Sequence, residues 1–360
     1  MSQNSENNNT PNSELVSTPK TINRFILHPS PTPTSQISGH LLPTPISDHP
    51  VYEALSYNHD PSTLSTDLSL DDAIYHSHFL AQEAYISISL TGLDFDIPET
   101  VYNALLALRH HDKERALWID AICLSEDELR DKRTKSTITP GVFAAAERVL
   151  VWLGNETTNS KEGIELLNLC ARYRHSFPAF KGVLPLSFVT EKHINGLVAL
   201  VTNPCFDQLW IIQELLLAPA ILLVSGAESA PWYALYHATA TLCAQAVAAY
   251  PRLSAVQSCQ AGYLWRNWRC LKEDRSRRNT LDSWLCLSRD CTGWEDKRER
   301  VFAVLGVSCD GEGVEVDYER SREEIAREVV RLYEGSSRVG SIKKEVRGVL
   351  GIGGGGVVKR

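Results

Sequence analysis

The sequence RVLVWLG at residues 148–154 decides how this chain folds. Five apolar residues that stop at a glycine are typical of a strand buried on both faces of a parallel sheet. Residues 117–123 and 220–226 are similar short apolar runs, and residues 52–57 alternate before a turn cluster. Sequence compatible with helices separates these four runs, so we predict an α/β protein with a mainly parallel sheet.

The segments between and after these strands are expected to be mainly helical. Residues 155–203 are less regular and are interpreted as an insertion, and residues 231–285 as a mainly helical region that begins the C-terminal portion. Further helices are predicted at residues 98–108, 161–173, 206–217 and 321–333, and further strands at 84–90 and 301–306.

Both ends of the chain have a composition that disfavours a packed core. Residues 1–50 hold 8 of the 17 prolines among many Ser, Thr and Asn residues, so this segment is predicted to be largely disordered. Within it, residues 23–27 are compatible with a short edge strand. Residues 336–360 are predicted to be a glycine-rich disordered tail.

Charge, hydropathy and cysteine usage exclude several classes of protein. The net charge of −8 opposes binding to a nucleic-acid backbone. The longest apolar run, residues 215–224, is half of a membrane span and contains Pro219, and residues 1–4 do not resemble a signal peptide. Nine scattered cysteines without Cys-x2-Cys pairs predict reduced thiols and no metal site. We expect a cytoplasmic protein without nucleic-acid or membrane partners.

Four separated blocks keep the order and spacing of one fungal family. Residues 52–57, 117–123 with 151–154, 206–214 and 296–318 together resemble the heterokaryon incompatibility (HET) domain, and the resemblance covers about residues 51–335. It implies a fungal protein of non-self recognition that triggers programmed cell death when different hyphae fuse. It also implies protein partners in incompatibility signalling and leaves a homo-oligomer open.

The loops depart from the family pattern while the apolar strand residues keep it. Asn58-His59-Asp60 stands where the family usually has Val-Trp-Gly, and residues 124–126 and 203–206 also differ. Gln208 replaces a common Arg. This pattern preserves a fold more securely than a site.

The segment Trp210-Ile211-Ile212-Gln213-Glu214-Leu215 has a second, more distant resemblance. It is similar to the Trp-x-x-x-Glu-Leu segment of TIR domains, a flavodoxin-like fold in which some members cleave NAD⁺ with that glutamate. Positions i and i+4 lie on one helical face. The resemblance implies that Trp210 walls a pocket and that Glu214 is catalytic; the alternative for Glu214 is an exposed or N-capping carboxylate.

Other residues at predicted strand ends are candidates for substrate binding. Asp120 ends a buried strand, where ligands of parallel sheets gather, but it is equally compatible with capping the next segment. Ser56 and Tyr57 end the first strand, and Tyr57 is also compatible with a core aromatic. Cys123 is interpreted as a buried structural thiol, because no His is placed to activate it.

These resemblances imply one of two functions. The first is an NAD⁺ glycohydrolase in cell-death signalling, with NAD⁺ as substrate, no cofactor and no metal. The second is a non-catalytic interaction or scaffold module of the same fold. The altered loop at residues 58–60 favours the second function, and the retained Trp210 and Glu214 favour the first.

Overall fold

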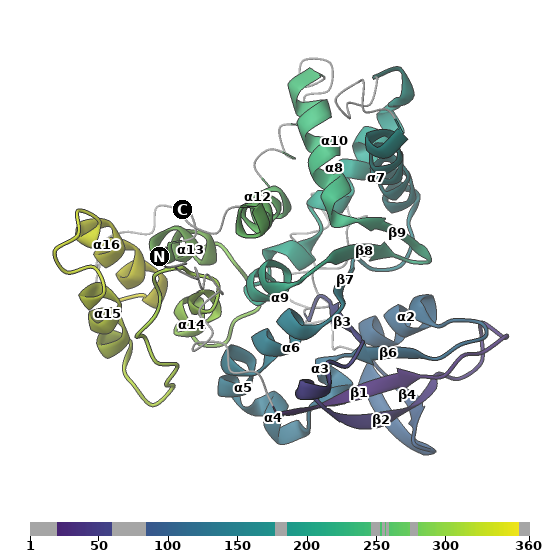
Figure 1. Cartoon of the computed structure of the whole chain (residues 1–360), viewed down its shortest axis with the longest axis horizontal. Coiled ribbons are helices and arrows are strands. Elements are labelled where there is room, and N and C mark those ends of the chain that lie inside the picture. Colours follow the sequence, from purple (N-terminus) through teal and green to yellow (C-terminus); the bar gives the residue numbers. More distant parts are fainter. Residues whose placement is uncertain are drawn as a thin grey trace, which may run out of the picture.

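Four parallel strands form the centre of a nine-stranded sheet (Figure 1). The computed structural model describes residues 20–59, 84–176, 186–245, 253, 256, 259–273 and 280–352. The central strands are β6 (Arg115–Trp118), β3 (Glu53–Ser56), β7 (Arg148–Trp152) and β8 (Ile221–Ser225), neighbours in that order. The prediction that these four runs share one sheet as parallel strands is confirmed. In order of sequence they run 2-1-3-4 across the sheet.

The sheet as a whole is mixed rather than mainly parallel. Its full order is β5-β4-β2-β1-β6-β3-β7-β8-β9, and four of the eight neighbouring pairs are antiparallel. Two-residue connections account for the pairs β4-β5 and β8-β9, because strands joined by a hairpin must run in opposite directions. The other two antiparallel pairs come from β1, which lies between β2 and β6 and is antiparallel to both. The added strands are β1 (Thr21–Leu27), β2 (Ser38–Pro45), β4 (Tyr85–Leu90), β5 (Leu93–Pro98) and β9 (Glu228–Pro231).

The N-terminal segment is more ordered than its proline content predicts. Strand β1 lies between β2 and β6, so it is an interior strand and not an edge strand. Its Phe25 and Leu27 are fully buried, and this apolar burial offsets the cost of ordering the proline-rich surroundings. The prediction of disorder is therefore wrong for residues 20–50, which also include the 3-10 turn Ile46–Asp48. Residues 1–19 lie outside the described part of the chain.

Short helices connect the central strands. Helix α2 (Glu99–Leu108) leads to β6, and a series of four helices leads from β6 to β7. The predicted strand at 117–123 ends at Trp118, and the predicted helix at 206–217 is interrupted at Gln208. The helices are α3 (Asp120–Cys123), α4 (Glu126–Arg130), α5 (Lys132–Thr137), α6 (Thr139–Ala145), η5 (Pro204–Asp207) and α9 (Ile211–Leu217).

The predicted insertion at residues 155–203 contains two packed helices, α7 (Thr158–Ser176) and α8 (Glu191–Val201). The turn Leu186–Phe188 precedes α8. Gly163 and Gly196 let the two backbones approach closely, since a Cβ built at Gly196 would lie 2.3 Å from Gly163 N. Figure 1 shows α7, α8 and α10 together beside the β7-β8-β9 end of the sheet.

The described part of residues 232–285 is mainly helical, as predicted, but two predictions for later residues are wrong. Residues 301–305 belong to helix α14 and not to a strand. The prediction failed because a short run of buried apolar residues is compatible with either a helix or a strand. Residues 339–350 form α16 rather than disordered tail, with Ile342, Val346 and Val349 buried on one face. The helices are α10 (Trp232–Gln245), α12 (Gln260–Glu273), α13 (Leu281–Ser288), α14 (Glu299–Leu305), α15 (Arg322–Arg331) and α16 (Val339–Leu350).

None of the helices in the described ranges combines the length and the apolar character needed to cross a bilayer. Residues 353–360 lie outside the described part of the chain.

Candidate functional site

The predicted site residues meet at the carboxyl edge of the central strands. Ser56 is the last residue of β3, and Asp120 begins α3 directly after β6. Glu214 lies in the first turn of α9, the helix that precedes β8. Because a helix that leads into a parallel strand begins at the carboxyl edge of the sheet, α9 brings Glu214 toward the ends of β3 and β6. The three residues come from separate segments of the chain.

Ser56 holds the Glu214 carboxylate. The Ser56 hydroxyl donates a hydrogen bond to Glu214 Oε2 at 2.5 Å. Ser56 is only 2% exposed, so the bond lies in a region of low dielectric, where a charge-assisted hydrogen bond is strong. The contact orients Glu214 and joins the end of β3 to α9.

Asp120 is held in a different way, by one side-chain and one backbone donor. Tyr57 donates a hydrogen bond from its phenol to Asp120 Oδ1 at 2.8 Å. The same oxygen accepts the backbone N–H of Ala121 at 2.7 Å, so Asp120 also satisfies an amide at the start of α3. Tyr57 is buried and acts as a hydrogen-bonding core aromatic.

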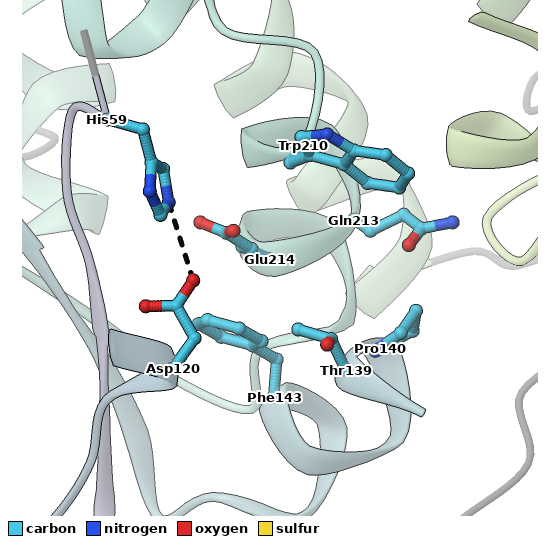
Figure 2. Close-up of a pocket in the computed structure, with 8 residues that line it drawn as sticks. All are labelled: His59, Asp120, Thr139, Pro140, Phe143, Trp210, Gln213 and Glu214. Atoms are coloured by element: carbon cyan, nitrogen blue, oxygen red, sulfur yellow. Dashed lines mark ion pairs between the residues drawn. The ribbon is translucent and has the colours of Figure 1, made fainter. Parts of the chain in front are cut away.

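A pocket lies between these two carboxylates (Figure 2). Its empty volume, including the open mouth, is about 350 Å³. Figure 2 shows the Glu214 carboxylate directed toward the space between His59 and Asp120, with the rings of Trp210 and Phe143 above and below it in this view. The lining residues are His59, Asp120, Thr139, Pro140, Phe143, Trp210, Gln213 and Glu214.

Trp210 walls the pocket as predicted, although it precedes the helix instead of lying within it. It is the N-cap residue of α9, and its carbonyl accepts the Glu214 N–H at 3.3 Å. Gln213 donates from Nε2 to the Phe302 carbonyl at 3.3 Å, so α14 supports α9 from behind. The block at residues 296–318 therefore contributes to the site by positioning α9.

His59 is a pocket residue that the sequence analysis did not select. Its Nε2 lies 3.6 Å from Asp120 Oδ2, and its ring lies 4.3 Å from that of Tyr57. The signal was the departure of residues 58–60 from the family pattern, which was interpreted as favouring a scaffold module without catalysis. The structure instead shows that the altered loop adds a titratable group to the pocket.

Two departures from the family pattern contact each other beside His59. Gln208 donates a short hydrogen bond from its side-chain amide to Asn58 Oδ1, and its Oε1 accepts the His59 backbone N–H at 3.4 Å. Asn58 and Gln208 are 2% and 5% exposed, so these polar groups are buried with their partners. The loop that carries His59 is thus fixed by a residue 150 positions away.

The thiol of Cys123 is structural, as predicted. Burial, with a smaller contribution from the charge of Asp120, raises the pKa of Cys123 to about 12. A thiol of this kind is not a nucleophile at neutral pH.

Within the described ranges, Glu162, Glu165 and His193 could hold a metal, because their ligand atoms lie within 4.8 Å of one another. However, His193 Nδ1 accepts the Thr190 N–H at 3.2 Å, so the neutral ring carries its proton on Nε2. That nitrogen faces Glu162 at 3.9 Å. A proton on the facing nitrogen favours a contact with Glu162 over metal binding.

Comparison with known proteins places the site residues inside a family match. Residues 52–214 match the model of the heterokaryon incompatibility protein (HET) family, a range that includes Ser56, Tyr57, Asp120, Trp210 and Glu214. The chain is also similar to heterokaryon incompatibility protein 6, OR allele, of Neurospora crassa, with 30% identity over 159 residues. The match covers 43% of this chain and 22% of that relative. A search of solved structures gave no significant match.

Proposed function

Because residues 52–214 of this chain belong to the fungal HET family, we propose that the protein acts in non-self recognition and cell-death signalling, and that it does so by cleaving the nicotinamide–ribose bond of NAD⁺. The Neurospora relative is named for heterokaryon incompatibility, which supports the first part. The matched segment is about a fifth of that relative, so the trigger and the partners are part of the proposal.

The arrangement of strands supports a TIR-like core. The central strands run 2-1-3-4, the order found in flavodoxin-like sheets, in which ligands bind where the strand order reverses. That reversal falls beside β3, the strand that ends at Ser56. The pocket therefore lies where this class of fold carries its ligands. The five antiparallel and edge strands make the sheet larger than such a core requires.

Glu214 held by Ser56 is the observation that carries the enzymatic proposal. In the cleavage, the bond between ribose C1′ and the ring nitrogen breaks, and its electron pair leaves with nicotinamide and neutralises the pyridinium. Positive charge develops on the ribose, as in glycoside hydrolysis, and a fixed carboxylate stabilises it. Water then adds at C1′ and releases a proton. A carboxylate that is already oriented costs no reorganisation during this step.

The altered loop does not count against this proposal. Asn58 and Gln208 are buried and bonded to each other, and Gln208 also accepts the His59 backbone N–H, so the loop is held at the mouth of the pocket by specific contacts. The alternative, a scaffold module without catalysis, predicts binding of protein partners and no release of nicotinamide.

The test is an assay of nicotinamide release by purified protein with NAD⁺. We expect activity in the wild type and a loss of at least about a hundredfold in Glu214→Gln, the size of effect typical of one electrostatic catalytic contact. Glu165→Gln on α7 is the matched control, because Glu165 is an exposed carboxylate outside the pocket. Growth arrest on expression in a filamentous fungus should follow the same order. An inactive wild type that still arrests growth would support the scaffold module instead.

A further inference from the structure

We infer that the pocket between β3, α3, α6 and α9 selects a permanently cationic aromatic ring, an N-substituted pyridinium, over neutral rings of the same shape. The inference rests on the proposed function in one respect: the bound ring is the leaving group only if the protein cleaves NAD⁺. It concerns binding, and it holds for pyridinium cations that carry no nucleotide.

Charge is the first observation. Asp120 and Glu214 line the pocket from different elements, and no Lys or Arg is among the described residues that line it. His59 lies 3.6 Å from Asp120 Oδ2, and a single imidazole offsets at most one of the two carboxylate charges. Two carboxylates in a recessed pocket produce a negative potential, which low-dielectric walls strengthen. A cation is attracted into such a pocket, whereas a neutral ring is not.

The apolar walls are the second observation. Phe143 and Trp210 line the pocket, and the face of an aromatic ring attracts a cation electrostatically. Phe143 is 2% exposed and packs edge-on against Trp118, with ring centroids 5.5 Å apart at an interplanar angle of 76°. Its ring is therefore held in one orientation before any ligand enters. Aromatic walls with nearby carboxylates are the usual means of binding quaternary nitrogen.

The two carboxylates have a further consequence. A pocket that recognised a dinucleotide through its phosphates would present Lys, Arg or backbone N–H groups to them. Because the described lining residues include two carboxylates and neither Lys nor Arg, we expect the phosphates of a dinucleotide to lie outside the pocket. A pyridinium without phosphates should then keep most of the affinity that the pocket provides.

The test measures binding at pH 8 by calorimetry with two matched probes. One is the 1-methylnicotinamide cation, and the other is neutral nicotinamide, which has the same ring and amide. We expect the cation to bind the wild type at least about tenfold more tightly. NAD⁺ and NADH provide a second pair, because they carry the same phosphates and differ in the charge of the ring. The same preference for the cation is expected there.

Asp120→Asn isolates the charge. An asparagine keeps an oxygen that can accept from Tyr57 and removes the negative charge, so affinity for the cation should fall about tenfold while affinity for nicotinamide is unchanged. Glu214→Gln should have the same selective effect, which keeps the test available if Asp120→Asn does not fold. Glu165→Gln should change neither affinity. Equal affinity of the wild type for both probes, or an equal loss for both in Asp120→Asn, would overturn the inference.

Binding and cleavage fail independently in this design. If the protein binds the cation selectively but releases no nicotinamide from NAD⁺, the inference about the pocket is supported and the proposed reaction is disproved. If the protein cleaves NAD⁺ but binds both probes equally, the reaction is supported and the inference about the pocket is disproved.

Discussion

The hydroxyl of Ser56 and the carboxylate of Glu214 form a 2.5 Å hydrogen bond between residues 158 positions apart. This contact connects a strand end to a helix start and decides which way the carboxylate points. In Ser56→Ala, Glu214 loses this donor, while the small side chain still fits the buried position.

For Ser56→Ala we expect nicotinamide release to fall by about tenfold, less than for Glu214→Gln, because the charge remains but is less well oriented. The free energy of unfolding should fall by about 0.5–1.5 kcal/mol, the net contribution of one hydrogen bond, because Glu214 is only half-buried and water can replace the hydroxyl. Steady-state kinetics and urea denaturation measure the two effects. A loss of activity as large as that of Glu214→Gln would mean that Ser56 itself takes part in the reaction.

The contact between Asn58 and Gln208 predicts a coupling energy. Because the two side chains are buried and bonded to each other, Asn58→Ala and Gln208→Ala should not be additive. In a double-mutant cycle, we expect a coupling of about 0.5–3 kcal/mol in the free energy of unfolding. Additive losses would show that the loop at residues 58–60 does not depend on Gln208.

Glu53 predicts a loss of stability in acid. Burial alone would raise its pKa, but hydrogen bonds and charges from Arg115 and Arg148 hold the pKa of Glu53 below its ordinary value of 4.5. A carboxyl with a lowered folded-state pKa stabilises the protein above its unfolded-state pKa and stops doing so as pH falls through the folded value. The wild-type melting temperature should therefore drop as pH is lowered from about 5 toward 3.

In Glu53→Gln this part of the pH dependence should be reduced, and stability at pH 7 should fall by about 3 kcal/mol, because the variant leaves two arginines without their carboxylate. Thermal denaturation of both proteins across this pH range is the measurement. Parallel curves for the two proteins would assign the acid sensitivity to other carboxyl groups.

Replacing glycine by alanine should have opposite effects on stability at two positions, Gly196 in the crossing of α7 and α8 and Gly340 in α16. A Cβ at Gly196 would lie 2.3 Å from Gly163 N and 2.6 Å from Asn159 O, so Gly196→Ala should destabilise by at least about 1–3 kcal/mol. Gly340 lies in α16, and a Cβ there would have no heavy atom within 4 Å. Gly340→Ala should therefore stabilise by about 0.5–1 kcal/mol, since alanine loses less backbone entropy in a helix. Melting temperatures that move in the same direction for both variants would contradict this account.

The sequence predicted the central strands well because burial on both faces leaves unbroken apolar runs, as at Val149 to Leu153. It failed where composition or length was ambiguous. Strand β1 was predicted only as a short edge strand in a largely disordered segment, because prolines are frequent around it. The apolar run of α14 has no periodicity that distinguishes a helix from a strand. The β4-β5 and β8-β9 hairpins, together with the antiparallel strand β1, turned a sheet expected to be mainly parallel into a mixed one.

The candidate site was predicted residue by residue but not as an assembly. Ser56, Tyr57, Asp120 and Glu214 were chosen separately, and the structure pairs Ser56 with Glu214 and Tyr57 with Asp120. His59 was missed because its role depends on Gln208, a contact across 149 residues that no local pattern reveals.

The separation of Ser56 and Glu214 along the chain also sets when the pocket can exist. At roughly 5–20 residues per second, a ribosome needs roughly 8–30 s to proceed from Ser56 to Glu214. Just before α9 is synthesised, the nascent chain contains β3, β6 and β7 but neither the α9 wall of the pocket nor the β8 partner of β7. An interrupted translation product that stops before α9 therefore lacks the Glu214 carboxylate altogether. Whatever chemistry the pocket performs, the cell meets it only from chains that have been synthesised past this point.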